Sequence, residues 1–178
     1  PFVDVDGASG LHQATEHLIE RGHRRIAAIA WPDDSRVGNE RLKGYFQTMQ
    51  SAALAVNPDW IRRGEGTFEF GRLAAAALLD LPEAQRPTAV VALNDTMAIG
   101  ALDLVRERGL DVRREFAVVG FDDAPMSQYL FPPLTTVRQP IREAGHKCVE
   151  MLVTLMAGRQ PAESQVLLSP RLIVRAST

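Results

Sequence analysis

Cysteine is almost absent from this chain, and Cys148 is its only representative. A single thiol excludes a disulfide within the chain and a metal site built from several cysteines, and it suits a reducing compartment. Histidine is also scarce, and His12 and His17 lie five residues apart, a spacing that does not put two ligands on one helix face. The sequence therefore predicts no metal site and no cofactor.

Charge of one sign and long apolar runs are missing as well. A net charge of −2 and a pI near 6.1 leave no basic surface for phosphates, so this segment is not expected to bind nucleic acid itself. No apolar run is long enough to span a membrane, and the opening PFVDVDG is not a signal peptide. Because this opening lacks an initiator Met and has the character of a strand, we expect a fragment of a longer protein.

The common catalytic motifs do not occur. The chain contains no G-x-S-x-G turn, no P-loop and no G-x-G-x-x-G. The adjacent acids Asp122 and Asp123 would point to opposite sides of a strand, which argues against paired general acid–base work. No enzymatic activity is predicted.

The chain does contain a regular alternation of two patterns. Apolar residues at helical spacing alternate with short continuous apolar runs such as RIAAIAW, TAVVAL and FAVVGF. Continuous runs of this length are typical of strands that are covered on both sides. This alternation of strands and helices predicts one α/β domain, with a parallel sheet and helices on both of its faces.

Polar side chains follow the predicted strands. Ligands of open parallel sheets bind beyond the carboxyl ends of the strands, so these positions are the candidate site. Carboxylate, carboxamide and guanidinium groups together suit a small polyhydroxylated or otherwise polar ligand, whereas a bare anion would require more positive charge. The residues at these ends are Trp31, Asp33, Asp34, Asn94, Asp95, Asp122, Asp123, Arg138 and Gln139, with Asp6 and Arg41 near helix starts on the same rim.

Residue type alone leaves structural alternatives open. Asp and Asn after a strand are commonest as helix N-caps, and that role is expected for Asp95 and Asp123. For Asn94 and Asp122, composition supports capping and ligand binding equally. Arg41, taken alone, is expected to be a solvated residue on a helix, as most arginines are.

Six phrases recur in a familiar order and spacing over nearly the whole chain. They are HLIERGHRRIAAIA, ERLKGY, PTAVVALNDTMAIGAL, AVVGFDDAP, PPLTTVRQP and PRLIVRAST. In this order they resemble the effector-binding core of the lactose-repressor (LacI/GalR) family of bacterial transcription regulators.

The resemblance implies a type I periplasmic-binding-protein-like fold, in which two α/β lobes hold a ligand between them. This chain would be mainly the C-terminal lobe, formed by residues 6–137 and 165–178. Residues 138–164 would be a helix and crossover belonging to the N-terminal lobe. The helix-turn-helix DNA-binding domain of the family would precede this chain and is absent from it.

The resemblance also implies five effector-binding residues. Arg41 falls on an arginine that family members direct at sugar hydroxyls or purine edges. Asn94 falls on the carboxamide after TAVVAL, Asp122 on the first acid after the GF of AVVGFDDAP, and Gln139 on the residue after TTVR. Asp6 falls on a rim acid that some members use.

The sequence departs from the family pattern at two places. Gly66 aligns where relatives often carry an aromatic residue that stacks on the ligand, and Phe68 and Trp31 are the candidates to replace it. Trp31 stands where the family usually has a glycine before proline, so it would narrow the mouth of the cleft, although a tryptophan more often packs than stacks on a ligand.

The implied function is effector binding and dimerisation in a cytoplasmic DNA-binding repressor or activator. The effector would be a sugar, nucleoside or purine, and the DNA would be bound through the absent N-terminal domain. Residues 127–131 and the helix after Asn94 would help to form a homodimer, and no membrane is involved. The alternative is a periplasmic sugar-binding protein of a transport system, which shares the fold but requires an upstream signal peptide and no DNA-binding domain.

Overall fold

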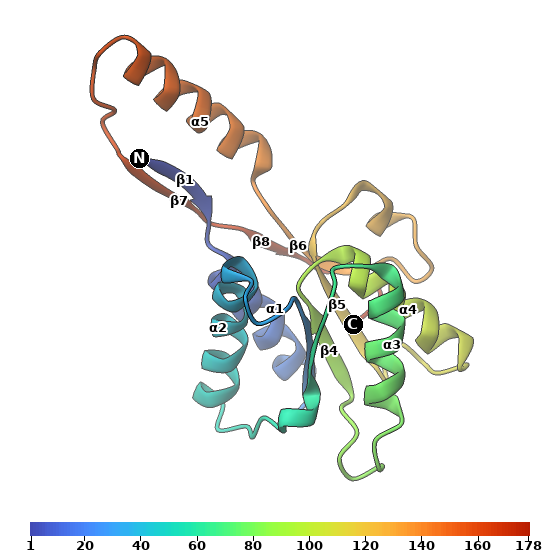
Figure 1. Ribbon diagram of the computed structural model, residues 1–178. Helices are drawn as coiled ribbons and strands as arrows, with labels where there is room; N and C mark the ends of the chain where they lie inside the picture. Colours follow the sequence, from blue (N-terminus) through green and yellow to red (C-terminus); the bar gives the residue numbers. More distant parts are fainter.

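The computed structural model describes the whole chain, Pro1 to Thr178, and its centre is a six-stranded sheet (Figure 1). The strand order is β3-β2-β4-β5-β6-β8. All neighbouring strands are parallel except β6 and β8, which are antiparallel. The strands are β2 (Ile26–Ala30), β3 (Ile61–Arg63), β4 (Ala89–Ala92), β5 (Ala117–Asp122), β6 (Thr135–Arg138) and β8 (Arg171–Ile173).

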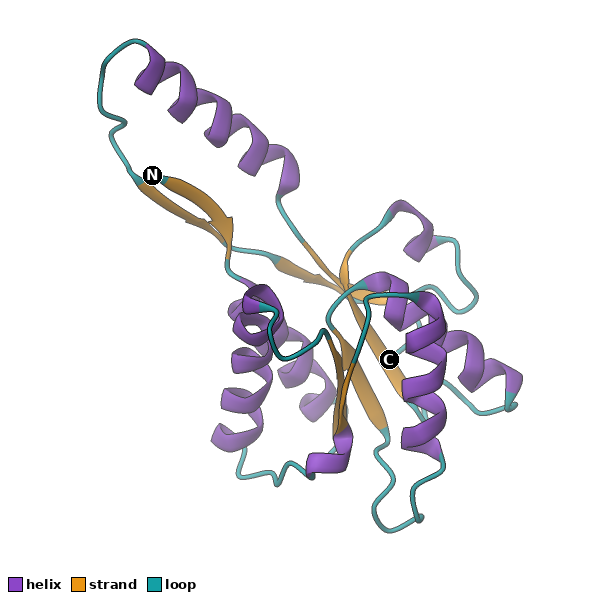
Figure 2. Ribbon diagram, viewed as in Figure 1, coloured by secondary structure: helices purple, strands orange, loops and turns teal.

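Helices cover both faces of this sheet, as the alternation of patterns predicted (Figure 2). Helices α1 (Gly7–Glu20) and α2 (Arg36–Ser51) pack against each other on one side, and α3 (Phe68–Leu79) and α4 (Asp95–Glu107) pack on the other. Every residue of β2 and β4 is buried. A strand with helices on both sides has no solvent face, which is why these segments are continuous apolar runs rather than alternating ones.

Glycines allow the two helix pairs to approach closely. A Cβ atom added at Gly44 of α2 would lie 1.9 Å from the backbone oxygen of Ala8 in α1. One added at Gly71 of α3 would lie 2.1 Å from the backbone oxygen of Met97 in α4. Each helix pair therefore meets backbone to backbone and holds the strand ends at a constant distance from the helix starts.

A smaller unit extends from one edge of the main sheet. Strand β1 (Phe2–Val5) pairs in parallel with β7 (Gln165–Leu168) in a separate two-stranded sheet, and α5 (Ile141–Met156) packs on β1. Figure 1 shows α5, β1 and β7 standing away from the main sheet. The chain passes between the two units before α1, after β6 and before β8.

Residues 165–178, which the resemblance places in the C-terminal lobe, divide between the two sheets. Residues 165–168 pair with β1 rather than with the main sheet, because the hydrogen-bonding edge of β1 lies next to them. The chain rejoins the main sheet only at β8. Pro140 is the N-cap of α5, and Gly158, with φ of 69°, follows the end of that helix.

Helix α5 exposes most of its apolar residues. Only Met151 is buried, while the side chains of Ile141, Val149, Leu152, Val153 and Met156 are exposed. No helix in the structure combines the length and hydrophobicity needed to cross a bilayer. Two short 3₁₀ turns, η1 (Pro58–Trp60) and η2 (Pro125–Gln128), complete the fold.

Candidate functional site

Arg41 lies at the carboxyl edge of the main sheet and is almost wholly buried, with 8% of its side chain exposed. Its Nη1 donates a hydrogen bond of 2.5 Å to the backbone oxygen of Leu93 at the end of β4. The guanidinium carbon lies 3.8 Å from the centre of the Phe121 ring and 4.9 Å from that of Trp31. An arginine over two aromatic rings is held by cation–π attraction, so Arg41 is a rigid part of this edge and not a solvated helix residue.

Asp122, at the end of β5, faces Arg41 and Gln139. Gln139 donates from Nε2 to Asp122 Oδ1 at 2.6 Å, and Arg41 Nη1 lies 3.7 Å from the same oxygen. The Asp122 side chain keeps 39% of its surface exposed, so the carboxylate remains open to solvent on one side. Its acceptor capacity is therefore only partly used within the chain.

Asn94 combines the two roles that composition left open. Its side-chain oxygen accepts from the backbone N–H of Met97 at 2.8 Å and caps α4, while its Nδ2 donates to the backbone oxygen of Gly66 at 3.1 Å. An N-cap residue satisfies an otherwise unpaired helix donor. Asn94 is thus anchored at the same edge as Asp122, with Gly66 next to it.

Asp6 is at the rim but does not contact the other predicted residues. Its carboxylate accepts from the N–H of Ser9 at 2.9 Å and caps α1, and its backbone N–H donates to Leu168. Neighbouring Gly7 is close to Arg41, since a Cβ added there would lie 2.8 Å from Arg41 Cγ. The charge of Asp4 also acts on Arg41, and it raises the pKa of that guanidinium.

The two acids at the end of β5 turn to different partners. Asp122 has φ of 123° and Asp123 has φ of 55°, values that are rare for residues other than glycine. Asp123 accepts hydrogen bonds from Arg138 and, at 2.6 Å, from Arg175. The prediction that Asp123 caps a helix was wrong, because η2 has no side-chain cap and the 7% exposed carboxylate is neutralised by two arginines instead.

Asp95 was also wrongly expected to be a helix cap. It is the first residue of α4, and its buried carboxylate accepts from the N–H of Ala124 at 2.7 Å, Ser127 Oγ at 2.6 Å and Thr136 Oγ1 at 2.5 Å. The neighbouring Asn94 takes the cap, because its side chain points back along the helix axis. Asp95 therefore fixes the β5–η2 loop and β6 to the start of α4.

Burial and charge act in opposite directions on these groups. Burial raises the pKa of Asp122, and the nearby Arg41 and Gln139 only partly offset that effect. Burial also lowers the pKa of the Arg41 guanidinium, against the opposing charges of Asp122 and Asp4. The two charges are thus held close together in a partly desolvated place, where each has a higher energy than in water.

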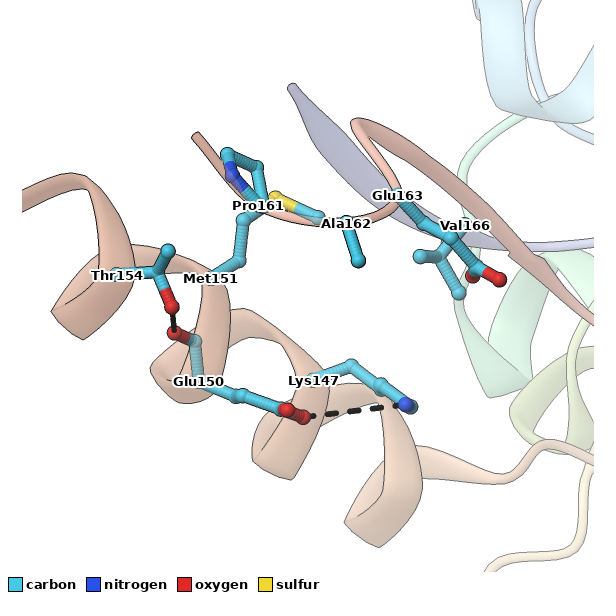
Figure 3. A pocket seen from close by; sticks show the side chains of 8 residues that line it. All are labelled: Lys147, Glu150, Met151, Thr154, Pro161, Ala162, Glu163 and Val166. Atoms are coloured by element: carbon cyan, nitrogen blue, oxygen red, sulfur yellow. Dashed lines mark hydrogen bonds and ion pairs between the residues drawn. The ribbon is translucent and has the colours of Figure 1, made fainter. Parts of the chain in front are cut away.

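A separate hollow of about 200 Å³ lies in the smaller unit, between α5 and the loop before β7 (Figure 3). Lys147 and Glu150 form an ion pair of 3.8 Å on its α5 side. None of the predicted site residues lines it, and no group of three or more His, Cys, Asp or Glu is arranged to hold a metal ion. Its lining residues are Lys147, Glu150, Met151, Thr154, Pro161, Ala162, Glu163 and Val166.

The structure therefore brings four of the five predicted residues to one edge. Arg41, Asn94, Asp122 and Gln139 lie at the ends of β4, β5 and β6 or beside them, and Asp6 caps a helix next to them. Sequence reasoning missed Phe121 as the ring under Arg41, because its place in a buried strand marked it only as core. It also missed Asp4, which the alternating letters of PFVDVDG place on the same side of the strand as Asp6.

Comparison with known proteins agrees with this architecture. The model of the periplasmic binding protein-like domain family matches residues 15–178. The repressor CytR of Escherichia coli K12 is 39% identical over 178 residues, which is all of this chain and 52% of CytR. The regulator CelR of Thermobifida fusca is 38% identical over 176 residues, 99% of this chain and 51% of CelR. The chain thus spans about half the length of these curated relatives.

Solved structures show the same likeness. A LacI-family regulatory protein from Chloroflexus aggregans is 60% identical with a TM-score of 0.95, over 98% of this chain and 62% of that one. A CelR–cellobiose complex is 38% identical with a TM-score of 0.91, over 99% of this chain and 53% of that one. The chain belongs to the periplasmic binding protein-like domain family, among the core domains of LacI-family transcription regulators.

Proposed function

We propose that this chain is the larger part of the effector-binding domain of a DNA-binding transcription regulator. A small neutral metabolite binds at Arg41, Asn94, Asp122 and Gln139, with Asp6 at the rim. The observation that carries the proposal is the contact between Asp122 and Gln139. It joins the end of a main-sheet strand to the segment that leads into the smaller unit. A ligand bound there would contact both units.

The charge balance of the site indicates the class of ligand. Arg41 and Asp122 are one positive and one negative group 3.7 Å apart, so the pair has no net charge, and with Asp6 at the rim the site has no positive charge left over to attract an anion. Donors on Arg41 and Gln139 lie next to the acceptor Asp122, with Asn94 at the same edge, an arrangement that suits neighbouring hydroxyl groups. A sugar or the ribose of a nucleoside fits this pattern, and purine edges are the remaining class.

We infer binding without turnover. The adjacent acids Asp122 and Asp123 are engaged by different partners, Asp122 by Arg41 and Gln139, and Asp123 by Arg138 and Arg175. Paired general acid–base work would require both carboxyls to face one reacting group.

The two units of this chain correspond, in the proposal, to two lobes. The main sheet forms most of the C-terminal lobe, and β1, α5 and β7 belong to the N-terminal lobe, whose remaining part would cover the apolar side chains that α5 exposes. A ligand can shift the equilibrium between two arrangements of the lobes only by the difference in its affinity for them. This coupling free energy is typically about 1–3 kcal/mol. The shift would alter DNA binding by a preceding helix-turn-helix domain in a cytoplasmic protein.

The proposed dimer surface is the loop after β5 together with α4. Tyr129 and Phe131 are 75% and 81% exposed, and Met126 is exposed beside them. The loop is not loose, because Asp95 accepts a hydrogen bond from buried Ser127 within it. A fixed loop that presents large apolar side chains to solvent is suited to contact a second copy.

A thermal-shift screen of the full-length protein tests the proposal. Sugars including cellobiose, nucleosides and purines are added singly, and a ligand that binds the folded state raises the melting temperature by mass action. We expect a neutral hydroxylated compound to raise it in the wild type and in Glu83→Gln, a change in the exposed turn before β4, but not in Asp122→Asn. An equal shift in Asp122→Asn would refute the assignment of the site.

A further inference from the structure

We propose that Trp31 forms a wall of the effector site and donates its indole N–H to the ligand, and that residue 66 is glycine because this wall occupies the adjoining space. The inference rests on the proposed function and deepens it, since it names a residue that selects the ligand.

Trp31 stands directly after β2, at the same edge of the sheet as Asn94 and Asp122. Its backbone oxygen accepts from Arg63 Nη1 at 3.1 Å, and its ring lies 4.9 Å from the guanidinium carbon of Arg41. Both contacts restrict the ring, one through the backbone and one through the aromatic face. The indole is therefore held beside Arg41, at the same edge of the sheet as the predicted ligand contacts.

The indole N–H of Trp31 makes no hydrogen bond within the chain, although the residue is half-buried. Trp60, the other tryptophan, donates its indole N–H to the backbone oxygen of Gln85 at 2.7 Å and is buried. A buried indole N–H usually has a partner within the protein, as that of Trp60 does, whereas a partly exposed one can donate to solvent or to a ligand. Trp60 is thus a satisfied structural tryptophan, whereas Trp31 has a donor available for a ligand.

Gly66 shows which way this donor faces. A Cβ atom added at Gly66 would lie 2.7 Å from Trp31 Nε1 and 2.9 Å from Asn94 Nδ2. Any side chain at 66 would displace the indole or the carboxamide, so a tryptophan at 31 and a bulky residue at 66 exclude each other. The N–H therefore lies at the junction of Gly66 and Asn94, next to the predicted ligand contacts.

This geometry defines what the wall binds. An indole offers an apolar face and one donor, which match the C–H face and an oxygen of a hydroxylated ring. Two sources share that chemistry, a free sugar and the ribose of a nucleoside. Testing cellobiose, D-ribose and adenosine separately distinguishes them.

The shared space is tested first, without any ligand, on the full-length protein. Gly66→Phe should lower the melting temperature by several degrees, and adding Trp31→Ala should restore most of the loss because it empties the contested space. Ala84→Phe is the control, since Ala84 is exposed in the turn between α3 and β4, away from the site. An unchanged melting temperature in Gly66→Phe, or a loss that Trp31→Ala does not relieve, overturns the packing argument.

The donor is tested with whichever of the three probes gives the largest thermal shift. Trp31→Phe keeps a ring over Arg41 but removes the N–H, and we expect affinity for that probe to fall about fivefold or more. Trp60→Phe removes an indole N–H elsewhere and should leave affinity unchanged. If the wild type and Trp31→Phe bind a probe equally, the ligand role of Trp31 is overturned and the proposed function is not affected. If the wild type binds none of the three probes, both the proposed function and the ligand role of Trp31 are contradicted.

Discussion

Gln139 donates a hydrogen bond of 2.6 Å to Asp122 at the point where the chain leaves the main sheet for the smaller unit. Asp122 is fixed by β5 and by its rare backbone conformation, while Gln139 lies in the connection to α5. A movement between the two units that carries Gln139 away from β6 would stretch or break this contact. The pair is therefore both a candidate binding site and a candidate sensor of the movement.

Replacing Asp122 by Asn should separate binding from stability. Asn has the same shape and tolerates a positive φ, but it lacks the charge that attracts Arg41. Loss of one charge-assisted hydrogen bond should weaken effector affinity about 10-fold to 100-fold. Burial raises the pKa of Asp122, which means that its ionised form is destabilised in the folded protein. Replacing it by a neutral side chain should therefore not lower the melting temperature. Calorimetric titration beside a melting curve checks both, with Glu83→Gln as control.

Two substitutions at Asn94 should distinguish capping from binding. Asn94→Ser keeps an oxygen that can accept from Met97 N–H but loses the Nδ2 donor to Gly66, so stability should hold while effector affinity falls. Asn94→Ala loses both groups and should also cost about 1 kcal/mol of unfolding free energy. Urea unfolding and ligand titration of both variants give the comparison. Equal stability in the two would contradict the capping role.

Asp123 should contribute to the acid limb of the stability curve. Burial alone would raise its pKa, but hydrogen bonds from Arg175 and Arg138 outweigh that effect and hold the pKa below its ordinary value of 3.8. The folded state thus binds fewer protons than the unfolded state, so the stabilisation is present above about pH 4 and is lost as pH falls through the folded pKa.

Asp123→Asn should therefore lower the free energy of unfolding at neutral pH, by on the order of 2 kcal/mol, and flatten its decline in acid. Urea unfolding at several values between about pH 7 and pH 3 measures the slope. Glu40→Gln, which removes an exposed ion pair with Lys43, should leave the slope almost unchanged. A variant as steep as the wild type would show that Asp123 is not the responsible group.

Because α1 and α2 approach so closely, adding a single methyl group at Gly44 should destabilise the protein. Gly44→Ala would force a Cβ to within 1.9 Å of the Ala8 oxygen, and the helices must separate, at a cost of about 1–3 kcal/mol or more. Gly145→Ala on α5 meets no atom and should be neutral or slightly stabilising, because alanine favours helix. Melting curves of the two variants provide the test.

The errors made from sequence share one cause. Asp95 and Asp123 were assigned as caps because each follows a strand, and strand-following acids usually cap. Their true partners, Thr136 and Arg175, lie 41 and 52 residues further along the chain. The pairing of β7 with β1 likewise joins segments near opposite ends of the chain, and no local pattern indicates it.

The sequence by itself determined the α/β alternation and the positions at which polar residues leave the strands, because both follow from local periodicity and from the identity of the residues after each apolar run. Only the tertiary structure decided which of two adjacent acids faces Arg41 and that the side-chain oxygen of Asn94 caps α4. It also decided why Trp31 and Gly66 are found together. Those outcomes depend on backbone dihedral angles and on side chains brought in from distant segments, and no local pattern contains that information.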